Sequence, residues 1–284
     1  MSQSIKDKTV NHFITNEFLI PLLEPTLLNT NVATRRKMGS GYAGKLILKY
    51  LHQMMAERPG VTIYAAKIDV SKFFYSIDHE ILHGMVRRRI KDPDVLECLK
   101  RIMEETNKTY INKMIKIYNN NFGTEIPLYE KGKGLSIGAV TSQFLAVFYL
   151  NDLDHKIKDV FCCERVIRYM DDIVIFDWDK DRLRWLIGAI EKELKILKLN
   201  MNPKSTIYNC CTDSGVPFLG YRYYVHNDKI YVKCLASTVK RVRKRLKNLK
   251  KHDIKKYNHS YEAYRGYFQN AWPEVTNEEI LQKL

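Results

Sequence analysis

The sequence lacks the features that would place the chain in a membrane or outside the cell. No run of about 18 apolar residues occurs, so a membrane-spanning helix is not expected. Residues 1–7 contain no apolar core of a secretory signal. Internal repeats and low-complexity linkers are also absent. These absences predict a cytoplasmic globular protein, whose 284 residues can bury a large core and divide into subdomains.

Cysteine is scarce and badly spaced for metal or disulfide chemistry. None of the 6 cysteines belongs to a C-x-x-C pair. The two vicinal pairs suit neither a zinc knuckle nor a secreted disulfide framework. The sequence therefore predicts reduced, mostly structural thiols at Cys98, Cys162, Cys163, Cys210, Cys211 and Cys234.

Acidic residues are outnumbered, because 47 Lys and Arg face 32 Asp and Glu and give a net charge of +15. A field of this size favours a polyanion or an anionic membrane as partner. The excess is largest at 239–256, where Asp253 is the only acid. The apolar seam of this segment consists of Val239, Val242, Leu246 and Leu249. Because the seam is narrow and lacks Trp and Phe, a helix that packs on protein and faces phosphates is favoured over one lying on a membrane.

An acidic turn lies between two apolar runs at 165–176. Asp171 and Asp172 follow Tyr169 and Met170, and the flanking runs are rich in β-branched and aromatic residues. This pattern predicts a β-hairpin with carboxylates at its tip. Adjacent carboxylates repel each other unless a cation neutralises them, and a hard divalent ion prefers oxygen ligands. The ordinary alternative is a solvated Asp-Asp loop. The rest of the chain must decide between this loop and a cation-binding hairpin.

Another acid follows a mostly apolar run. Residues 61–70 read as a buried strand that ends near Asp69, a costly place for a carboxylate without a partner or a function. Residues 71–78 then lead into a helix that runs to about Arg89, with Asp78 as its N-cap. Periodicity and turn residues predict further helices at 43–56, 94–118, 144–157 and 179–198, and a hairpin around 226–228.

Four motifs in a fixed order carry a family resemblance. They are Asp69 with Phe74 five residues later, the glycine-containing segment 134–143, the hairpin at 169–172 and the turn at 218–221. This order and content resemble the palm of reverse transcriptases, whose signature hairpin is Tyr-x-Asp-Asp. The resemblance covers residues 5–270.

The resemblance implies an α+β right-hand polymerase with an antiparallel palm sheet, helical fingers and a basic helical thumb. The fingers would occupy 1–60, without the N-terminal fingertip hairpin of the family, and their connecting helices 91–134. The palm would occupy 61–90 and 135–232, including the primer grip, and the thumb 233–284. No endonuclease or RNase H domain is recognisable in the sequence.

The implied activity is that of an RNA-directed DNA polymerase that copies a template RNA into cDNA. In-line attack on a nucleotide is assisted by two Mg²⁺ ions ~3.5–4 Å apart, for which Mn²⁺ can substitute. Asp69 and Asp171 match the metal ligands of the family, the carbonyl of Val70 would also face a metal, and Asp172 would support the site. The other partners would be a DNA or RNA primer and dNTPs.

Further residues match nucleotide and duplex contacts of the family. Phe74 matches the steric gate that excludes a 2′-hydroxyl, with a core phenylalanine as the alternative. Other nucleotide-binding positions are Ile137, Gly138, Lys204, Arg35 and Arg36. Positions implied for template or primer are Ser142, Gln143, Phe218, Leu219, Gly220, Tyr221, Lys240, Arg243, Lys244 and Lys247.

One motif differs from the commoner form and points to a subfamily. Residues 137–143 read Ile-Gly-x-x-x-Ser-Gln, where many bacterial and retroviral members have Gln-Gly-x-x-x-Ser-Pro. This form resembles the enzymes of diversity-generating retroelements, which implies error-prone copying and a small basic helical accessory protein. The rival interpretations are a retron-like or phage-defence reverse transcriptase, a catalytically weak RNA-binding relative, and a basic membrane-surface protein.

Overall fold

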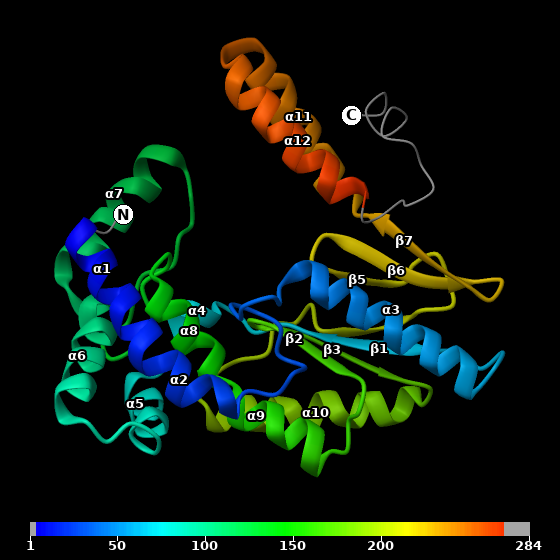
Figure 1. Cartoon of the computed structure of the whole chain (residues 1–284), viewed down its shortest axis with the longest axis horizontal. Coiled ribbons are helices and arrows are strands. Elements are labelled where there is room, and N and C mark those ends of the chain that lie inside the picture. The colour runs from blue at the N-terminus through cyan, green and yellow to red at the C-terminus, as the bar shows by residue number, and fades with distance from the viewer. Residues whose placement is uncertain (1–3, 270–284) are drawn as a thin grey trace. The chain divides into compact units, whose positions relative to one another are not determined.

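The computed structural model describes residues 4–269, and the chain separates into two compact units (Figure 1). The first unit comprises Met1–Gly39, Ala66–Ile175 and Asp181–Thr206. The second comprises Ser40–Ala65, Phe176–Lys180 and Ile207–Leu284. Across 4–269, no helix is both long and apolar enough to cross a membrane. All six cysteines lie within the described residues, and none of them forms a disulfide bond.

The first unit begins with a nearly continuous helical segment. Its parts are α1 (Ile5–Ile14), the π-helical turn η1 (Thr15–Leu19), α2 (Ile20–Leu23) and the 3₁₀ turn η2 (Glu24–Thr26). Ser4 begins α1 as an N-cap, because its hydroxyl accepts a hydrogen bond from the amide of Asp7. The hydroxyls of Thr15 and Thr141 lie 3.0 Å apart in the interior and join this segment to the helix that follows Ala139.

The next helices of this unit are shorter than the sequence predicts. They are α4 (Phe73–Ser76), α5 (His79–Arg87), α6 (Pro93–Met103), the 3₁₀ turn η3 (Glu104–Asn107) and α7 (Thr109–Phe122). Asp78 caps α5 as predicted and accepts from the amides of Glu80 and Ile81. The single helix predicted at 94–118 is wrong, because η3 interrupts it. The interruption is held by the buried hydroxyl of Thr106, which donates to the backbone carbonyls of residues 133 and 134.

The helices α8 (Val140–Tyr149) and α9 (Asn151–His155) and the π-helical turn η4 (Lys156–Val160) replace the helix predicted at 144–157. Leu150 leaves helical geometry between α8 and α9, with φ −96° and ψ 8°. The prediction for 179–198 is confirmed as α10 (Lys180–Ile196). The apolar stripe of α10 is fully buried at Leu183, Leu186, Ile190 and Leu194.

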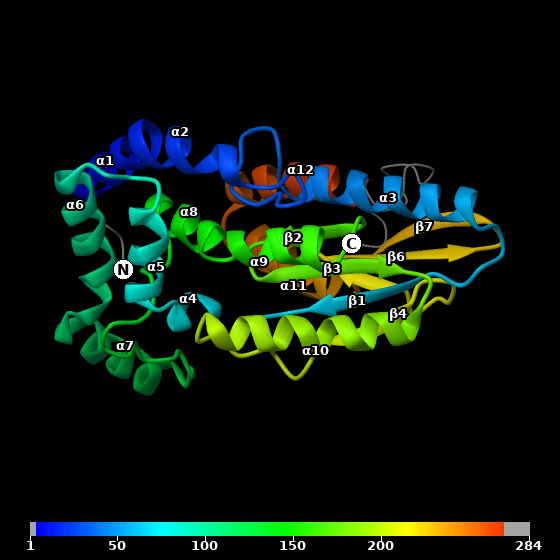
Figure 2. The ribbon, with the colours of Figure 1, turned by 90° about the horizontal axis from the view of Figure 1, so that it is seen from below.

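A four-stranded sheet has the order β2-β3-β1-β4. Its strands are β1 (Tyr64–Ile68), β2 (Val166–Tyr169), β3 (Asp172–Asp177) and β4 (Thr206–Asn209), and α10 runs beside it (Figure 2). Strands β2 and β3 are antiparallel, and the pair Tyr169↔Asp172 closes their ladder. Met170 and Asp171 therefore form a two-residue turn, which confirms the predicted hairpin.

The second unit contains α3 (Ser40–Glu57) and an antiparallel sheet of β5 (Val216–Phe218), β6 (Tyr221–His226) and β7 (Lys229–Cys234). Asn227 and Asp228 join β6 to β7 as a two-residue turn, at the predicted position, and both have positive φ (47° and 55°). These residue types tolerate that conformation better than others.

Two helices, α11 (Ala236–His252) and α12 (Ile254–Gln269), lie side by side in the second unit (Figure 1). Val242, Leu246 and Phe268 form the core between them. The single helix predicted at 239–256 is wrong, because Asp253 is extended (φ −156°) and its carboxylate accepts from the amide of Lys256 at the start of α12. Residues 270–284 of the predicted thumb lie outside the described residues.

Candidate active site

The hairpin turn of the first unit carries two half-buried acids, Asp171 and Asp172. Met170 adopts a positive φ of 56°, which is costly for a residue with a side chain. Burial raises the pKa of Asp171 to about 6, and the carboxylates of Asp172 and Asp69 add to this shift. The fold therefore brings the three predicted acids within electrostatic reach of one another.

Asp69 directly follows β1 and is held by the turn at 202–205. The side-chain amide of Asn202 donates to Asp69 Oδ2 (2.6 Å), and the backbone amide of Asn202 donates to the Asp69 carbonyl (2.8 Å). The hydroxyl of Ser205 accepts from the Asp69 amide (3.1 Å). Lys204 lies on the same turn, and its side chain is exposed. The turn that carries Lys204 therefore also fixes the position of Asp69.

Asp172 has a cationic neighbour on β1. Lys67 Nζ lies 3.4 Å from Asp172 Oδ1, with both side chains about a quarter exposed. Burial raises the pKa of Asp172, and the ammonium group of Lys67 opposes that shift. The sequence interpretation missed Lys67, Asn202 and Ser205. Lys67 could have been found, since residues two apart on a strand share a face and Lys67 precedes Asp69 by two.

The carboxylates of Asp69, Asp171 and Asp172 are oxygen donors of the kind that suits a hard divalent cation. The raised pKa of Asp171 reflects first its burial and then repulsion from Asp172 and Asp69, and a bound cation would favour the ionised form. Among residues 4–269, however, no three or more His, Cys, Asp or Glu side chains are grouped closely enough to form a ready-made metal site. Asp69 and Asp172 instead direct oxygens toward Asn202 and Lys67, with which a cation would compete.

Two adjacent phenylalanines of α4 differ in environment. Phe73 is buried in the core, whereas Phe74 is half-buried, with the ring centroids 5.8 Å apart. The core alternative considered for Phe74 therefore describes Phe73 better. Ile137 is 59% exposed, and with Tyr75 it lines a groove of about 690 Å³ along α7. The following Gly138 has φ 103°, a conformation that favours glycine.

The other nucleotide-side and template-side positions separate into engaged and exposed residues. Arg35 donates to Glu24 Oε1 (3.1 Å) and to two backbone carbonyls, so it holds its own loop together. Arg36 is exposed. Ser142 is buried, whereas Gln143 is half-buried. Arg36 and Gln143 are therefore the two of these four positions whose side chains are accessible to a ligand, because Arg35 is engaged in its loop and Ser142 is buried.

The predicted primer-grip turn belongs to the second unit. Leu219 and Gly220 have φ 46° and 90°. A Cβ on Gly220 would collide with the hydroxyl of Tyr267, so glycine is required by space as well as by conformation. Tyr221 stacks on Tyr267 at 4.6 Å and donates to its carbonyl at 2.8 Å. Phe218 is buried. The turn is therefore fixed rigidly to α12.

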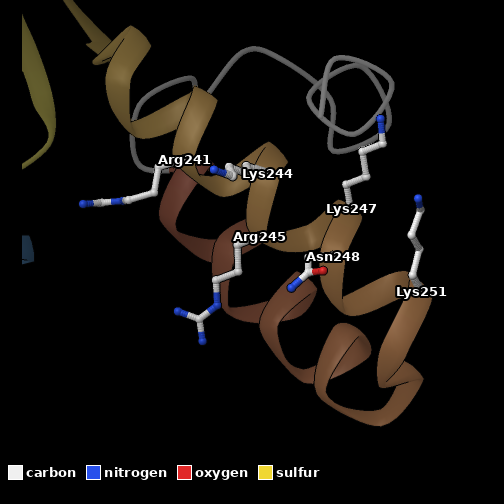
Figure 3. A pocket seen from close by; sticks show the side chains of 6 residues that line it. All are labelled: Arg241, Lys244, Arg245, Lys247, Asn248 and Lys251. Atoms are coloured by element: carbon white, nitrogen blue, oxygen red, sulfur yellow. The ribbon is translucent and has the colours of Figure 1, made fainter. Parts of the chain in front are cut away.

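A basic surface lies on α11, opposite the apolar seam. Its side chains project from the helix around a shallow hollow lined by Arg241, Lys244, Arg245, Lys247, Asn248 and Lys251 (Figure 3). The sequence predicts four duplex contacts on this helix: Lys244 and Lys247 line the hollow, and Lys240 and Arg243 are exposed but do not line it. The structure adds Arg241, Arg245 and Lys251, which the helical period of the seam already placed on the polar side.

The sequence model of the family described as reverse transcriptase (RNA-dependent DNA polymerase) matches residues 3–223. The chain belongs to this family. The matched range includes Asp69, the hairpin at 169–172 and the turn at 218–221. No curated protein sequence matches the chain.

Three solved telomerase structures show a similar fold. Apo telomerase from Candida tropicalis is 14% identical with a TM-score of 0.53, covering 97% of this chain and 52% of that one. A form of the same enzyme without its C-terminal domain is 13% identical with a TM-score of 0.52, covering 80% of this chain and 44% of that one. Telomerase from Candida albicans, in complex with a fragment of telomeric RNA, is 10% identical with a TM-score of 0.51, covering 96% of this chain and 48% of that one. The chain spans about half the length of these relatives and shares their α+β reverse transcriptase fold.

Proposed function

We propose that this reverse transcriptase copies an RNA template into cDNA by extending a DNA or RNA primer with dNTPs. The observation that carries the proposal is the hairpin tip, where Asp171 and Asp172 lie within electrostatic reach of Asp69. Such a concentration of partly buried carboxylates is costly without a function. It suits a reaction in which cations stabilise a phosphoryl transition state.

Asp69, Asp171 and the carbonyl of Val70 would hold two Mg²⁺ ions, or Mn²⁺ in their place. When bound, such ions activate the primer 3′-hydroxyl and stabilise the leaving pyrophosphate. Asn202 and Ser205 orient Asp69, and Lys67 balances the charge of Asp172. Lys204, exposed on the turn that holds Asp69, is the proposed basic residue near the pyrophosphate.

The nucleotide would lie against Phe74 and the segment Ile137–Gly138. The half-buried ring of Phe74 is available to exclude a 2′-hydroxyl, in keeping with a deoxynucleotide substrate. Arg36 is the proposed triphosphate contact, because Arg35 is already engaged with Glu24. Gln143 is the proposed template contact of its motif, since Ser142 is buried.

The duplex would be bound through its backbone by Lys240, Arg243, Lys244 and Lys247 of α11, and the primer end by the turn at 218–221. The proposed subdomains are fingers at 1–60 and 91–134, palm at 61–90 and 135–232, and thumb at 233–284. The exposed basic side of α11 supports this assignment of the thumb. The Candida albicans telomerase structure contains RNA, which agrees with a nucleic-acid template.

Within the family, we favour the diversity-generating retroelement type, with error-prone copying and a small basic helical accessory protein. Ile137 supports this choice, because its exposed apolar side chain cannot donate the hydrogen bonds that glutamine would. The alternatives are a retron-like or phage-defence enzyme and a catalytically weak RNA-binding relative. Misincorporation by the wild type no higher than by Ile137→Gln would refute the error-prone assignment.

Primer extension on an RNA template with Mg²⁺ and dNTPs tests the activity. Asp69→Asn should lower the rate about 10³-fold, since several kcal/mol of transition-state stabilisation are lost. Asp213→Asn, on an exposed loop of the second unit, is the matched control and should retain activity. Extension that survives in Asp69→Asn would refute the proposed site.

Binding of an RNA–DNA duplex at increasing salt tests α11. Each of Lys244→Ala and Lys247→Ala should weaken binding for all sequences and reduce the slope of log K against log salt by about 1. Lys195→Ala on α10, also exposed and on a helix, provides the comparison. Equal salt slopes for all three variants would remove α11 from the interface.

A further inference from the structure

A fully buried arginine lies directly beneath the hairpin turn. Arg168 on β2 is 1% exposed, and its guanidinium makes a side-on pair with Asp154 of α9. Nε donates to Asp154 Oδ1 and Nη2 to Asp154 Oδ2, both at 2.6 Å. This planar, two-bond arrangement fixes the guanidinium in one orientation, which a lysine could not reproduce.

Two further N–H groups of Arg168 donate to backbone carbonyls. Nη1 donates to the carbonyl of Met170 (2.7 Å), and Nη2 donates to the carbonyl of Val147 on α8 (2.9 Å). Met170 is the turn residue with positive φ and is directly bonded to Asp171. One side chain therefore connects the turn that carries the acid to the two helices packed within the same unit.

The backbone of Arg168 is also fixed. Its amide donates to the carbonyl of Thr30 (2.9 Å), and its carbonyl accepts from the amide of Val32 (3.0 Å). The turn itself is strained, because a residue with a side chain at positive φ costs about 1–3 kcal/mol. A strained turn keeps its geometry only when its surroundings impose it, and the bond from Arg168 to Met170 is a direct restraint of that kind.

Stability alone does not explain this pair. A buried ion pair can often be replaced by apolar residues of similar size without loss of stability, because desolvation offsets the attraction between the charges. What apolar residues cannot supply is a donor aimed at the Met170 carbonyl. The geometry thus separates two roles, holding the fold and orienting the turn.

We propose that Arg168, oriented by Asp154, is a positioning residue that holds the Met170 carbonyl and thereby sets the direction of the Asp171 carboxylate toward the divalent ion. The inference rests on the proposed function for the identity of the ion ligand. Arg168 touches neither nucleotide nor metal in this role. It acts through the turn, so its loss changes cation binding and turnover more than dNTP binding.

The decisive variant is the double substitution Arg168→Met with Asp154→Leu, which removes both charges and keeps an apolar filling. Folding is checked by thermal unfolding, and Arg168→Lys provides a second variant that keeps the charge. We expect the double variant to fold and its kcat to be reduced about 10- to 100-fold, because a small misplacement at a reacting centre has an effect of this size. The half-saturating Mg²⁺ concentration should rise several-fold, with KM for dNTP nearly unchanged.

The matched control is the pair Arg88–Asp152. It also joins an arginine to an aspartate of the first unit at 2.6 Å, but both side chains are exposed. Arg88→Gln with Asp152→Asn should leave kcat and the Mg²⁺ requirement within twofold. A folded Arg168→Met/Asp154→Leu protein with equally unchanged values would overturn the proposal. Arg168→Lys should show the same loss in kcat if the fork geometry matters.

Mn²⁺ binding, measured from the electron paramagnetic resonance signal of free Mn²⁺, separates this inference from the proposed activity. The wild type should bind Mn²⁺ more tightly than Asp171→Asn, and the double variant should bind it several-fold less tightly than the wild type. If Mn²⁺ binds in this way but no primer is extended, the polymerase proposal fails and the positioning role stands. Mn²⁺ binding that does not depend on Asp171, or that the double variant retains, overturns the positioning role.

Discussion

Two hairpins of this protein have turns of the same length but different conformation and surroundings: Met170 alone has positive φ in one, whereas Asn227 and Asp228 both do in the other. In each, two residues join antiparallel strands and an aspartate stands second, at Asp171 in one and Asp228 in the other. Asn227 and Asp228 are exposed and adopt positive φ, which their residue types tolerate. Met170 adopts positive φ without that tolerance, and Asp171 is partly buried among other acids.

The difference teaches that a two-residue turn with an aspartate in second place does not by itself make a site. In the β6–β7 turn, the residue types Asn227 and Asp228 themselves tolerate the positive φ that the turn requires. The β2–β3 turn is held by Arg168 from below, while Asn202 and Lys67 hold the neighbouring acids Asp69 and Asp172. Backbone strain is therefore present at Met170 and small at Asn227 and Asp228, and strained residues are expected to concentrate at functional sites.

Exchanging each turn aspartate for asparagine gives the largest contrast. Asp171→Asn should reduce primer extension about 10³-fold, because the carboxylate proposed to hold a cation is lost. Asp228→Asn should remain within twofold, since its side chain is exposed and asparagine suits positive φ. Single-turnover extension rates measure both. Equal losses in the two variants would show that the hairpins are not functionally distinct.

A β-branched residue in the second turn should affect stability without affecting chemistry. Asn227→Val should lower the free energy of unfolding by about 1–2 kcal/mol, because valine resists positive φ. Denaturant unfolding gives the change, and extension per folded molecule should stay unchanged. The comparison between the turns would be weakened if this variant kept full stability.

The pH dependence of stability should differ between the turns in metal-free protein. Folding raises the pKa of Asp171 from 3.8 to about 6, so its ionised form destabilises the fold. Asp171→Asn should therefore gain nothing below pH 3.8 and an increasing amount up to pH 6, reaching about 1–2 kcal/mol after allowance for partial exposure. Asp228→Asn should show no such rise. Urea unfolding between pH 3.5 and 8 measures both curves, and a gain for Asp171→Asn that is independent of pH would contradict the electrostatic cause.

Glycine in the first turn should produce the smallest effect. Met170→Gly relieves the positive φ and should raise the free energy of unfolding by no more than about 0.5–1 kcal/mol, because the unfolded chain also gains freedom. Asn227→Gly should change stability by only a few tenths of a kcal/mol, as asparagine already tolerates the conformation. Thermal unfolding of the two variants tests the ranking, and a larger gain at Asn227 would reverse it.

Much of the local structure was readable from the sequence. The hairpin at 169–172, the cap at Asp78, the stripe of α10 and the turn at 227–228 follow from alternation, capping and turn residues. The long helices predicted at 94–118, 144–157 and 239–256 were wrong in their continuity. Their interruptions depend on contacts of Thr106, the geometry at Leu150 and the cap formed by Asp253.

The sequence by itself determined the family, the α+β fold class and the choice of the three acids that interact electrostatically, because these follow from short-range patterns and their order along the chain. Only the tertiary structure decided which partner holds each acid. Asn202 lies 133 residues from Asp69, and Asp154 lies 14 residues from Arg168. The structure also placed Arg35 in its own loop and Ser142 in the interior. Such pairings depend on packing between distant segments, which no local pattern of apolar and polar residues encodes.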